Sequence, residues 1–142
     1  MNDLQYEPLA EIHAEDLLSL WGDEDVICFT NIHAPCSLSE IQQRICRLAV
    51  FDVFVIRYKG ELAGVIGCPC ISKIKEEYGS FYHFKKTFWN RGIATQAIEW
   101  LLNYMQTKYT SAIFYADVIV DNVASEKILK HFGFHCTSVK EN

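Results

Sequence analysis

The chain has 142 residues, half of them hydrophobic and 22% charged, with a formal net charge of −5. These proportions are those of an ordinary globular protein, and we expect residues 1–142 to form one domain. Nucleic-acid binding is disfavoured, because neutralising phosphates requires clustered lysine and arginine. A membrane span is also disfavoured, since no apolar run approaches the roughly eighteen residues required and no charged-then-apolar leader precedes the first predicted strand. We therefore expect a cytoplasmic protein.

The cysteines are scattered and include no C-x-x-C pair. Cys68 and Cys70 alternate on a predicted strand, but they lack a companion pair at zinc-ligand spacing. We therefore expect no bound metal, and free thiols buried as small hydrophobic side chains. The six positions are Cys28, Cys36, Cys46, Cys68, Cys70 and Cys136.

The first third of the sequence predicts one strand and two helices. Residues 4–9 are β-prone and predict a short strand. A helix is expected over residues 14–21, whose apolar residues form one broad face, and Gly22 ends the pattern. A second helix is expected to begin at Ser37, where Glu40 completes a capping box. Its apolar stripe repeats at helical spacing: Leu38, Ile41, Ile45 and Leu48.

A β-hairpin follows. Residues 53–58 and 62–71 are β-rich, and Lys59-Gly60 between them offers a tight turn. Gly64 and Gly67 lie inside the returning strand, where glycine indicates a bulge or a close approach of another backbone.

The next elements lead to the best-patterned helix. A polar loop is expected over residues 72–77, and an aromatic strand over residues 78–84. The apolar residues of 93–108 recur at helical spacing and predict a long helix. The run over 112–120 is so densely apolar that it predicts a strand covered on both faces.

The sequence closes with a helix over residues 123–131, a left-handed stop at Gly133 and a last strand over residues 134–139. This order predicts an α/β fold, with a mixed β-sheet flanked by helices on its faces. The strands before and after the long helix should be parallel, because a helical crossover joins them.

The stretch Phe88–Ala97 ends a polar segment and opens the long helix, and it is typical of an anion-binding turn. The small residues Gly92 and Ala94 let the backbone approach a ligand, and the first amides of a helix are unpaired. These amides and the helix dipole suit a phosphate or pyrophosphate. The chain contains neither G-x-x-x-x-G-K-[ST] nor a strand followed by G-x-G-x-x-G, which excludes those two phosphate motifs.

This stretch resembles the acetyl-CoA loop of the GCN5-related N-acetyltransferase (GNAT) family, most closely its ribosomal-protein-alanine-acetyltransferase-like (RimJ/RimL-like) branch. That branch tends to read W-x-(K/R)-G-x-A-T-(E/Q)-A. The wider family usually carries Gln or Arg three residues before the glycine, where this chain and the branch have tryptophan. The matching residues are Trp89, Arg91, Gly92, Ala94, Thr95, Gln96 and Ala97.

A second segment strengthens the resemblance. The family's N-x-x-S/A…G-F pattern is matched in register by Asn122, Ser125, Gly133 and Phe134. Two separate motifs in the family's order are much harder to obtain by chance than either one alone.

The resemblance implies the acyl-CoA N-acyltransferase fold, with a mixed, mostly antiparallel sheet that usually has one further strand at its C-terminal end. Since this sequence ends at Asn142, we expect that strand to be missing, or its edge to be supplied or covered by another chain. The second case predicts a homodimer joined near residues 134–139.

The implied reaction is transfer of an acetyl group from acetyl-CoA to a primary amine, by direct attack within a ternary complex. The implied acceptor is an amine-bearing small molecule or a protein N-terminus. Two alternatives stay open: a catalytically weak or inactive acyl-CoA-binding module, and a domain whose glycine turn is incidental and which has no CoA site.

The resemblance also implies the co-substrate site. The strand before the phosphate loop should splay from its neighbour, so that backbone groups around Tyr82 and Phe84 face the pantetheine and the acetyl oxygen. Asn122 would hydrogen-bond the pantetheine arm. The loop itself would contribute Trp89, Arg91, Gly92, Ile93, Ala94 and Thr95.

For the general base, Glu77 is the first choice and His83 the second, because a strand's period of two places them on one face. Many family members place a tyrosine seven residues after the motif asparagine, where this chain has Leu129. The resemblance therefore points to Ser125 as the group beside the departing thiolate, whose own pKa lets it leave readily. Other candidates for this role are Tyr82, Tyr104 and Tyr115.

Each assignment has a structural alternative. Asn122 can act only as a helix cap, and Ser125 can simply fill the first turn of that helix. Glu77 and His83 can be exposed strand residues without a catalytic role.

Overall fold

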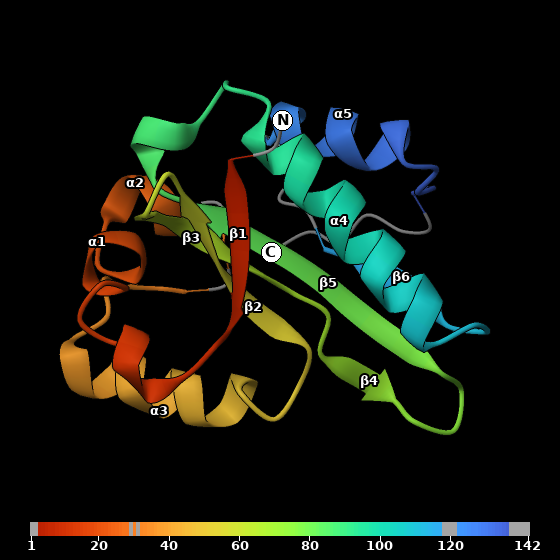
Figure 1. Cartoon of the computed structure of the whole chain (residues 1–142), viewed down its shortest axis with the longest axis horizontal. Coiled ribbons are helices and arrows are strands. Elements are labelled where there is room, and N and C mark those ends of the chain that lie inside the picture. Colours follow the sequence, from red (N-terminus) through yellow and green to blue (C-terminus); the bar gives the residue numbers. More distant parts are fainter. Residues whose placement is uncertain (1–2, 29, 31, 118–121, 137–142) are drawn as a thin grey trace.

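The computed structural model of the chain describes residues 3–28, 30, 32–117 and 122–136. Figure 1 shows a sheet with helices α1, α2 and α3 on one side and α4 and α5 on the other. In chain order the elements are β1 (Leu4–Pro8), the 3₁₀ helix η1 (Glu11–His13), α1 (Leu18–Trp21), α2 (Glu24–Ile27), α3 (Leu38–Leu48), β2 (Val53–Tyr58), β3 (Glu61–Gly67), β4 (Cys70–Ser72), β5 (Glu77–Phe84), the 3₁₀ helix η2 (Lys86–Phe88), α4 (Ile93–Lys108), β6 (Ile113–Ala116) and α5 (Val123–His131).

The strands form one mixed sheet, in the order β1-β2-β3-β5-β4, with β6 also paired to β5. All pairings are antiparallel except that of β5 with β6, which are parallel and joined through α4. This confirms the predicted α/β class and the predicted parallel pair. Strand β5 is central to the fold, because its second half pairs with β3 while its first half pairs with β4 and β6.

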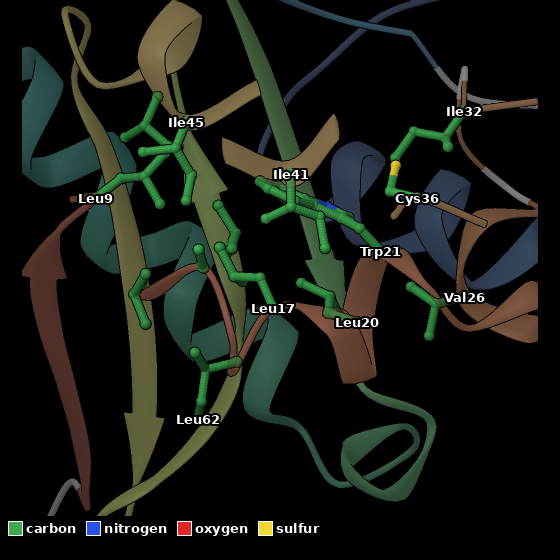
Figure 2. Packing of buried hydrophobic residues seen from close by; sticks show 14 of the residues in the cluster. Leu9, Leu17, Leu20, Trp21, Val26, Ile32, Cys36, Ile41, Ile45 and Leu62 are labelled. Atoms are coloured by element: carbon green, nitrogen blue, oxygen red, sulfur yellow. The ribbon is translucent and has the colours of Figure 1, made fainter. Parts of the chain in front are cut away.

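Two hydrophobic cores lie on opposite faces of the sheet, because successive side chains of a strand point to opposite sides. Val53 and Val55 of β2 face the core under α1, α2 and α3. Phe54 and Ile56 face the core under α4. Figure 2 shows part of the first core, where Trp21 lies beside Ile41 of α3. The predicted helices on both faces of the sheet are confirmed.

The hairpin of β2 and β3 follows the prediction closely. Lys59 (φ 50°) and Gly60 (φ 86°) have the left-handed conformations of a tight hairpin turn. The register between the strands shifts near Gly64, which confirms the expected bulge. A Cβ atom on Gly64 would lie only 2.2 Å from the carbonyl oxygen of His83 on β5. Only glycine therefore lets β5 approach β3 at this point.

Helices α3 and α4 also match their predictions. Ser37 caps α3 by accepting a hydrogen bond from the Glu40 amide (3.2 Å), and the Glu40 carboxylate accepts one from the Ser37 amide (3.0 Å). Helix α4 runs over Ile93–Lys108 as expected, and Gly133 after α5 has the left-handed conformation (φ 89°).

The predicted helix over residues 14–21 is wrong in extent. Residues 14–17, which follow the 3₁₀ helix η1, form turns, and only Leu18–Trp21 is α-helical. The Ala10 amide donates to His13 Nδ1 (3.1 Å), and His13 Nε2 contacts the Glu7 carboxylate at 3.1 Å. These bonds hold the chain that enters the segment against β1. Helix α2, which was not predicted, is capped by the side chain of Asp23.

The predicted strand over residues 62–71 is also wrong in extent, because it is divided into β3 and β4 at Cys68-Pro69. Proline has no amide hydrogen for the ladder. The Pro69 carbonyl still accepts a bond from the Gly79 amide (2.9 Å), so the chain passes β5 without pairing continuously.

The C-terminal part differs most from expectation. Strand β6 is not covered on both faces, since Ile113 and Tyr115 are exposed. Residues 134–136 belong to no strand, and the rest of the last predicted strand, like residues 118–120, lies outside the described residues. The homodimer predicted at this edge therefore stays a prediction. Among the helices of the described ranges, none has the length and apolar character needed to cross a membrane.

Candidate active site

The N-terminus of α4 presents free backbone amides at the surface. The first hydrogen bond of the helix runs from the Gln96 amide to the Gly92 carbonyl (3.2 Å). The amides of Ile93, Ala94 and Thr95 precede that bond and have no partner within the helix. Gly92 is exposed with φ 75°, and a Cβ atom there would meet nothing within 4 Å. The turn before these amides is therefore open to a ligand, as phosphate binding at a helix N-terminus requires. We call Gly92 and the amides of Ile93, Ala94 and Thr95 the cradle.

Trp89 fixes this turn to the sheet. Its indole N–H donates to the carbonyl of Phe84 at the end of β5 (2.9 Å), and its ring packs against both cores. The exposed Arg91 lies beside the turn, with its guanidinium 5.2 Å from the ring centre of Tyr58 and 5.4 Å from that of Phe88. One positive charge is thus held next to the amides.

An open edge of β5 leads toward the cradle. The parallel pairing of β5 with β6 ends at Ser80 and Ala116. Beyond this point, residues 81–84 pair with β3 on one side, and no described residue of β6 pairs with them on the other. Between described residues, the pairing of the two strands thus ends where the resemblance implies a splay.

The direction of the backbone groups along this edge follows from the strand period. The Lys85 amide donates to the Ala63 carbonyl on β3 (2.8 Å). Since alternate amides of a strand point to opposite sides, those of Tyr82 and Phe84 point away from β3, toward the open edge. These are the two residues predicted to face the pantetheine and the acetyl oxygen.

Ser125 and Asn122 lie at the start of α5. The Asn122 side-chain oxygen accepts a hydrogen bond from the Ser125 amide (3.3 Å), so Asn122 caps the helix and keeps its amide nitrogen as a free donor group. The Tyr82 hydroxyl is buried without a hydrogen-bond partner among the described residues. Burial raises the pKa of Tyr82, and the neighbouring Ser125 side chain opposes that rise. The structure thus brings Ser125 and Tyr82 together.

His83 lies on the opposite face of β5, in a pocket of about 220 Å³ lined by Trp21, Ile32, Arg44, Leu48, Phe81 and His83. The indole N–H of Trp21 donates to His83 Nδ1 (3.0 Å). Burial, with a smaller contribution from the charge of Arg44, lowers the pKa of His83 to about 4. At neutral pH the imidazole is therefore uncharged and carries its proton on Nε2, which makes it a donor toward the pocket.

Glu77 does not join His83. It begins β5, six residues earlier, which corresponds to about 20 Å along an extended strand. Its carboxylate accepts a hydrogen bond from the Tyr115 hydroxyl on β6 (2.8 Å), and this bond is the main reason that the pKa of Tyr115 is raised. The expectation that Glu77 and His83 face one amine is therefore not supported by their positions.

Tyr104 is also separate from the cradle. Its hydroxyl donates to the Asp52 carboxylate (3.3 Å), which also binds Lys108 (2.7 Å) and the Tyr109 hydroxyl (2.9 Å). These contacts tie the C-terminal half of α4 to the residue preceding β2, which is a structural role. No group of three or more His, Cys, Asp or Glu side chains in the described ranges is arranged to hold a metal ion.

Sequence reasoning missed the side chains that face His83, above all Trp21 and Arg44. Trp21 was assigned only to the apolar face of a helix. Arg44 follows Ile41 by three residues and precedes Leu48 by four, so it borders the buried stripe of α3. A charged residue at such a position was the available signal.

Solved structures with the same fold include three acetyltransferases. A GNAT-family acetyltransferase from Bacillus anthracis has a TM-score of 0.85 and 15% identity, over 96% of this chain and 82% of that one. An acetyl transferase from Salmonella typhimurium that modifies the N-terminal serine of a 50S ribosomal subunit protein has a TM-score of 0.80 and 19% identity, over 97% and 84%. A microcin self-immunity acetyltransferase, MccE, in complex with acetyl-CoA and AMP, has a TM-score of 0.78 and 21% identity, over 97% and 82%.

A comparison with curated protein sequences gives no significant match. The family model described as the acetyltransferase (GNAT) domain matches residues 3–135. This match covers nearly the whole chain and contains both motifs, the cradle and the open edge of β5. The chain therefore belongs to the GNAT acetyltransferase family.

Proposed function

We propose that the protein is an N-acetyltransferase that moves an acetyl group from acetyl-CoA to a primary amine by direct attack in a ternary complex. The observation that carries this proposal is the alignment of three features: unpaired amides at Ile93–Thr95, the glycine turn at Gly92, and the open edge of β5 at Tyr82. Similar solved structures include one with acetyl-CoA bound.

The pyrophosphate of acetyl-CoA would bind the amides of Ile93, Ala94 and Thr95, where the helix dipole favours negative charge. Arg91 would add a positive charge beside them. Trp89 would act indirectly, by holding the turn to the Phe84 carbonyl. The pantetheine arm would lie along the open edge of β5, with the free amide nitrogen of Asn122 as a donor.

In the reaction, the amine nitrogen attacks the thioester carbonyl carbon, and the carbon–sulfur bond breaks to release CoA as a thiolate. The oxyanion formed on attack requires a donor, and the Tyr82 amide points to the open edge where it can serve. A nearby hydroxyl would assist the departing thiolate, and Ser125 and Tyr82 are the two candidates. A serine hydroxyl is a poor acid, so Ser125 would stabilise or relay a proton to a thiolate that already leaves readily.

The amine must lose a proton, and we assign that step to water. His83 is a weak candidate for the base, because accepting a proton on Nδ1 would break its bond to Trp21. Its lowered pKa, near 4, also makes it a poor acceptor. The role predicted for Glu77 stays a prediction, and its position at the far end of β5 does not favour it.

The acceptor is a primary amine of a small molecule or of a protein N-terminus. The Salmonella relative, whose fold this chain shares, modifies a protein N-terminal serine. Nothing in the comparisons favours a module that binds acyl-CoA without turnover. Cytoplasmic location, a single domain and the homodimer stay predictions.

Isothermal titration with acetyl-CoA and CoA tests the cradle, with Gly92→Glu as the variant and Gly60→Glu as its matched control. Both glycines have left-handed φ and open space where a Cβ would lie, so both substitutions carry a similar backbone cost. Only Gly92→Glu places a carboxylate at the pyrophosphate site. We expect it to weaken binding by about a hundredfold or more, because like charges in contact cost several kcal/mol.

Acetyl transfer to a panel of amines completes the test. Binding by the wild type and by Gly60→Glu, loss of binding in folded Gly92→Glu, and release of CoA with at least one amine would support the proposal. Tight binding with no transfer to any amine would support the inactive module instead. Absence of binding by the wild type would remove the co-substrate site altogether.

A further inference from the structure

The His83 pocket lies directly behind the stretch of β5 that borders the open edge. Phe81 and His83 point into the pocket, while the Tyr82 side chain between them packs in the core under α4. One strand therefore separates the pocket from the place where the co-substrate would lie. Its volume, about 220 Å³, is below the usual range for a whole ligand, so it suits one group of a larger acceptor.

The polar groups that line this pocket are all donors. Arg44 carries the only formal charge among the lining residues, and the lining contains no aspartate or glutamate. The neutral His83 offers its Nε2–H, and the Trp21 N–H is already bound to His83 Nδ1. A cationic group in the pocket would meet the positive charge of Arg44 and the N–H of His83, and no acceptor is left free among these side chains.

Arg44 packs against an aromatic ring, but its guanidinium has hydrogen-bonding capacity that is not used within the described chain. Its guanidinium lies 5.5 Å from the ring centre of Trp21, which is fully buried. Among the described residues, its Nε is buried without a hydrogen-bond partner, and Arg44 takes part in none of their ion pairs. Glu40, one turn earlier, feels the charge of Arg44, but its carboxylate is bound to the Ser37 amide. A buried donor without a partner costs free energy that a ligand oxygen would recover.

We propose that Arg44 and His83 bind an anionic oxygen group, a carboxylate or a phosphate, on the acceptor, so that the preferred acceptor is an amine that also carries a negative charge. This inference rests on the proposed acetyltransferase function. A planar guanidinium suits both groups, because it can donate two parallel hydrogen bonds to either one. The net charge of the whole chain, −5, points the other way, but only the charges that line the pocket contact the substrate.

The test compares amidated peptides that differ at a single residue next to the N-terminus: aspartate, phosphoserine, asparagine or lysine. CoA release gives kcat/KM for each, and the aspartate and phosphoserine arms distinguish a carboxylate from a phosphate. We expect the wild type to prefer the anionic peptides over the asparagine peptide by about tenfold or more, as for a hydrogen bond to a charged group. The lysine peptide should be the poorest acceptor.

Three variants assign the preference to Arg44. Arg44→Gln should abolish it, and Arg44→Glu should favour lysine instead. Arg47→Gln removes the same charge from an exposed position on the same helix and should keep the wild-type preference. Equal preference in the wild type and in Arg44→Gln would overturn the inference.

Two further measurements separate this inference from the proposed function. Titration of each variant with acetyl-CoA should give wild-type affinity, because Arg44 lies on the other side of β5 from the cradle; loss of this binding would concern the proposed function alone. Titration of the CoA complex with the N-acetylated peptides reports the pocket without turnover. If the acetylated aspartate and phosphoserine peptides bind no better than the lysine peptide, the inference is wrong even where acetyl transfer occurs.

Discussion

The cradle and the His83 pocket lie on either side of one strand, but the cradle is made of backbone groups and the pocket of side chains. The cradle consists of backbone amides from consecutive residues, Ile93–Thr95, shaped by the left-handed Gly92. The pocket consists of side chains from α1, α3, β5 and the loop at Ile32, which are far apart in the sequence. A backbone site depends on a local turn, whereas a side-chain site depends on how distant elements pack. The cradle can therefore be predicted from the sequence, whereas the pocket cannot.

The largest expected effect comes from disturbing the strand that both sites share. Gly64→Ala would place a Cβ atom 2.2 Å from the His83 carbonyl oxygen and 2.9 Å from the Phe84 ring, so β5 must move away from β3. We expect about 3 kcal/mol of lost stability, measured by urea unfolding. Gly60→Ala, at a left-handed φ of 86° but with nothing within 4 Å of the new Cβ, should cost only about 1 kcal/mol. Equal losses would show that β5 is not held by this approach.

The pocket can be tested alone through the titration of His83. The pKa of His83 is about 4 in the folded protein, against about 6.5 in an unfolded chain. Unfolding therefore takes up a proton between these values, so stability is full above pH 6.5 and is lost as the pH falls toward 4. The loss should reach up to about 3 kcal/mol, and less where water reaches the half-buried ring.

His83→Gln is the matched reference for this titration, since glutamine can still accept a bond from Trp21 but does not titrate. Urea unfolding of both proteins between pH 7 and pH 4.5 should show a steeper loss for the wild type. Parallel curves would mean that His83 titrates normally and is not enclosed as described.

The acetyl-transfer step on the co-substrate side of β5 is tested by Ser125→Ala. This substitution should lower kcat by about tenfold, which corresponds to about 1.4 kcal/mol in activation free energy. The substitution keeps the backbone bond to Asn122, so α5 remains capped. The KM for acetyl-CoA should stay the same. Comparison with Tyr82→Phe and the double variant shows whether the two hydroxyls act together, since a shared role gives non-additive losses. An unchanged kcat in Ser125→Ala would remove this residue from the mechanism.

The smallest expected effect comes from weakening α3, the helix that lines the pocket but not the cradle. Ser37→Ala removes the side-chain acceptor that caps α3 and should cost about 1 kcal/mol in stability. Affinity for acetyl-CoA should not change, because α3 contributes to the pocket and not to the cradle. Ser39→Ala, at an exposed position two residues along, should have almost no effect on stability. A weaker affinity for acetyl-CoA in Ser37→Ala would mean that the two regions are not independent.

Much of the fold was predictable because its signals are local. Helix α4 has the predicted bounds, since Gly92 marks its start and its apolar residues repeat at helical spacing. The hairpin follows from Lys59-Gly60. The predictions failed where a distant contact decides the outcome. The predicted strand over residues 62–71 divides at Cys68-Pro69, where the Pro69 carbonyl accepts a bond from the Gly79 amide of β5.

The candidate site likewise contains residues that local motifs predict and residues that only distant contacts bring together. The positions of Gly92, Asn122 and Ser125 could be assigned from two short motifs, although their roles stay predictions. The pairing of Trp21 with His83 joins residues 62 positions apart, and no periodicity in either segment reports it. The sequence pattern places Glu77 and His83 on one face of β5. It does not show that the two residues are too far apart to contact the same substrate amine.

The alternation of β5 also bears on how such a protein can change during evolution. Phe81 and His83 can be replaced without altering the residues that face the other core, because Tyr82 and Phe84 project to the opposite side. A lineage could thus acquire a new acceptor while inheriting its acetyl donor unchanged. The same separation tells the protein engineer which positions to randomise in order to change the acceptor: Phe81, His83 and the side chains of α3 that face them.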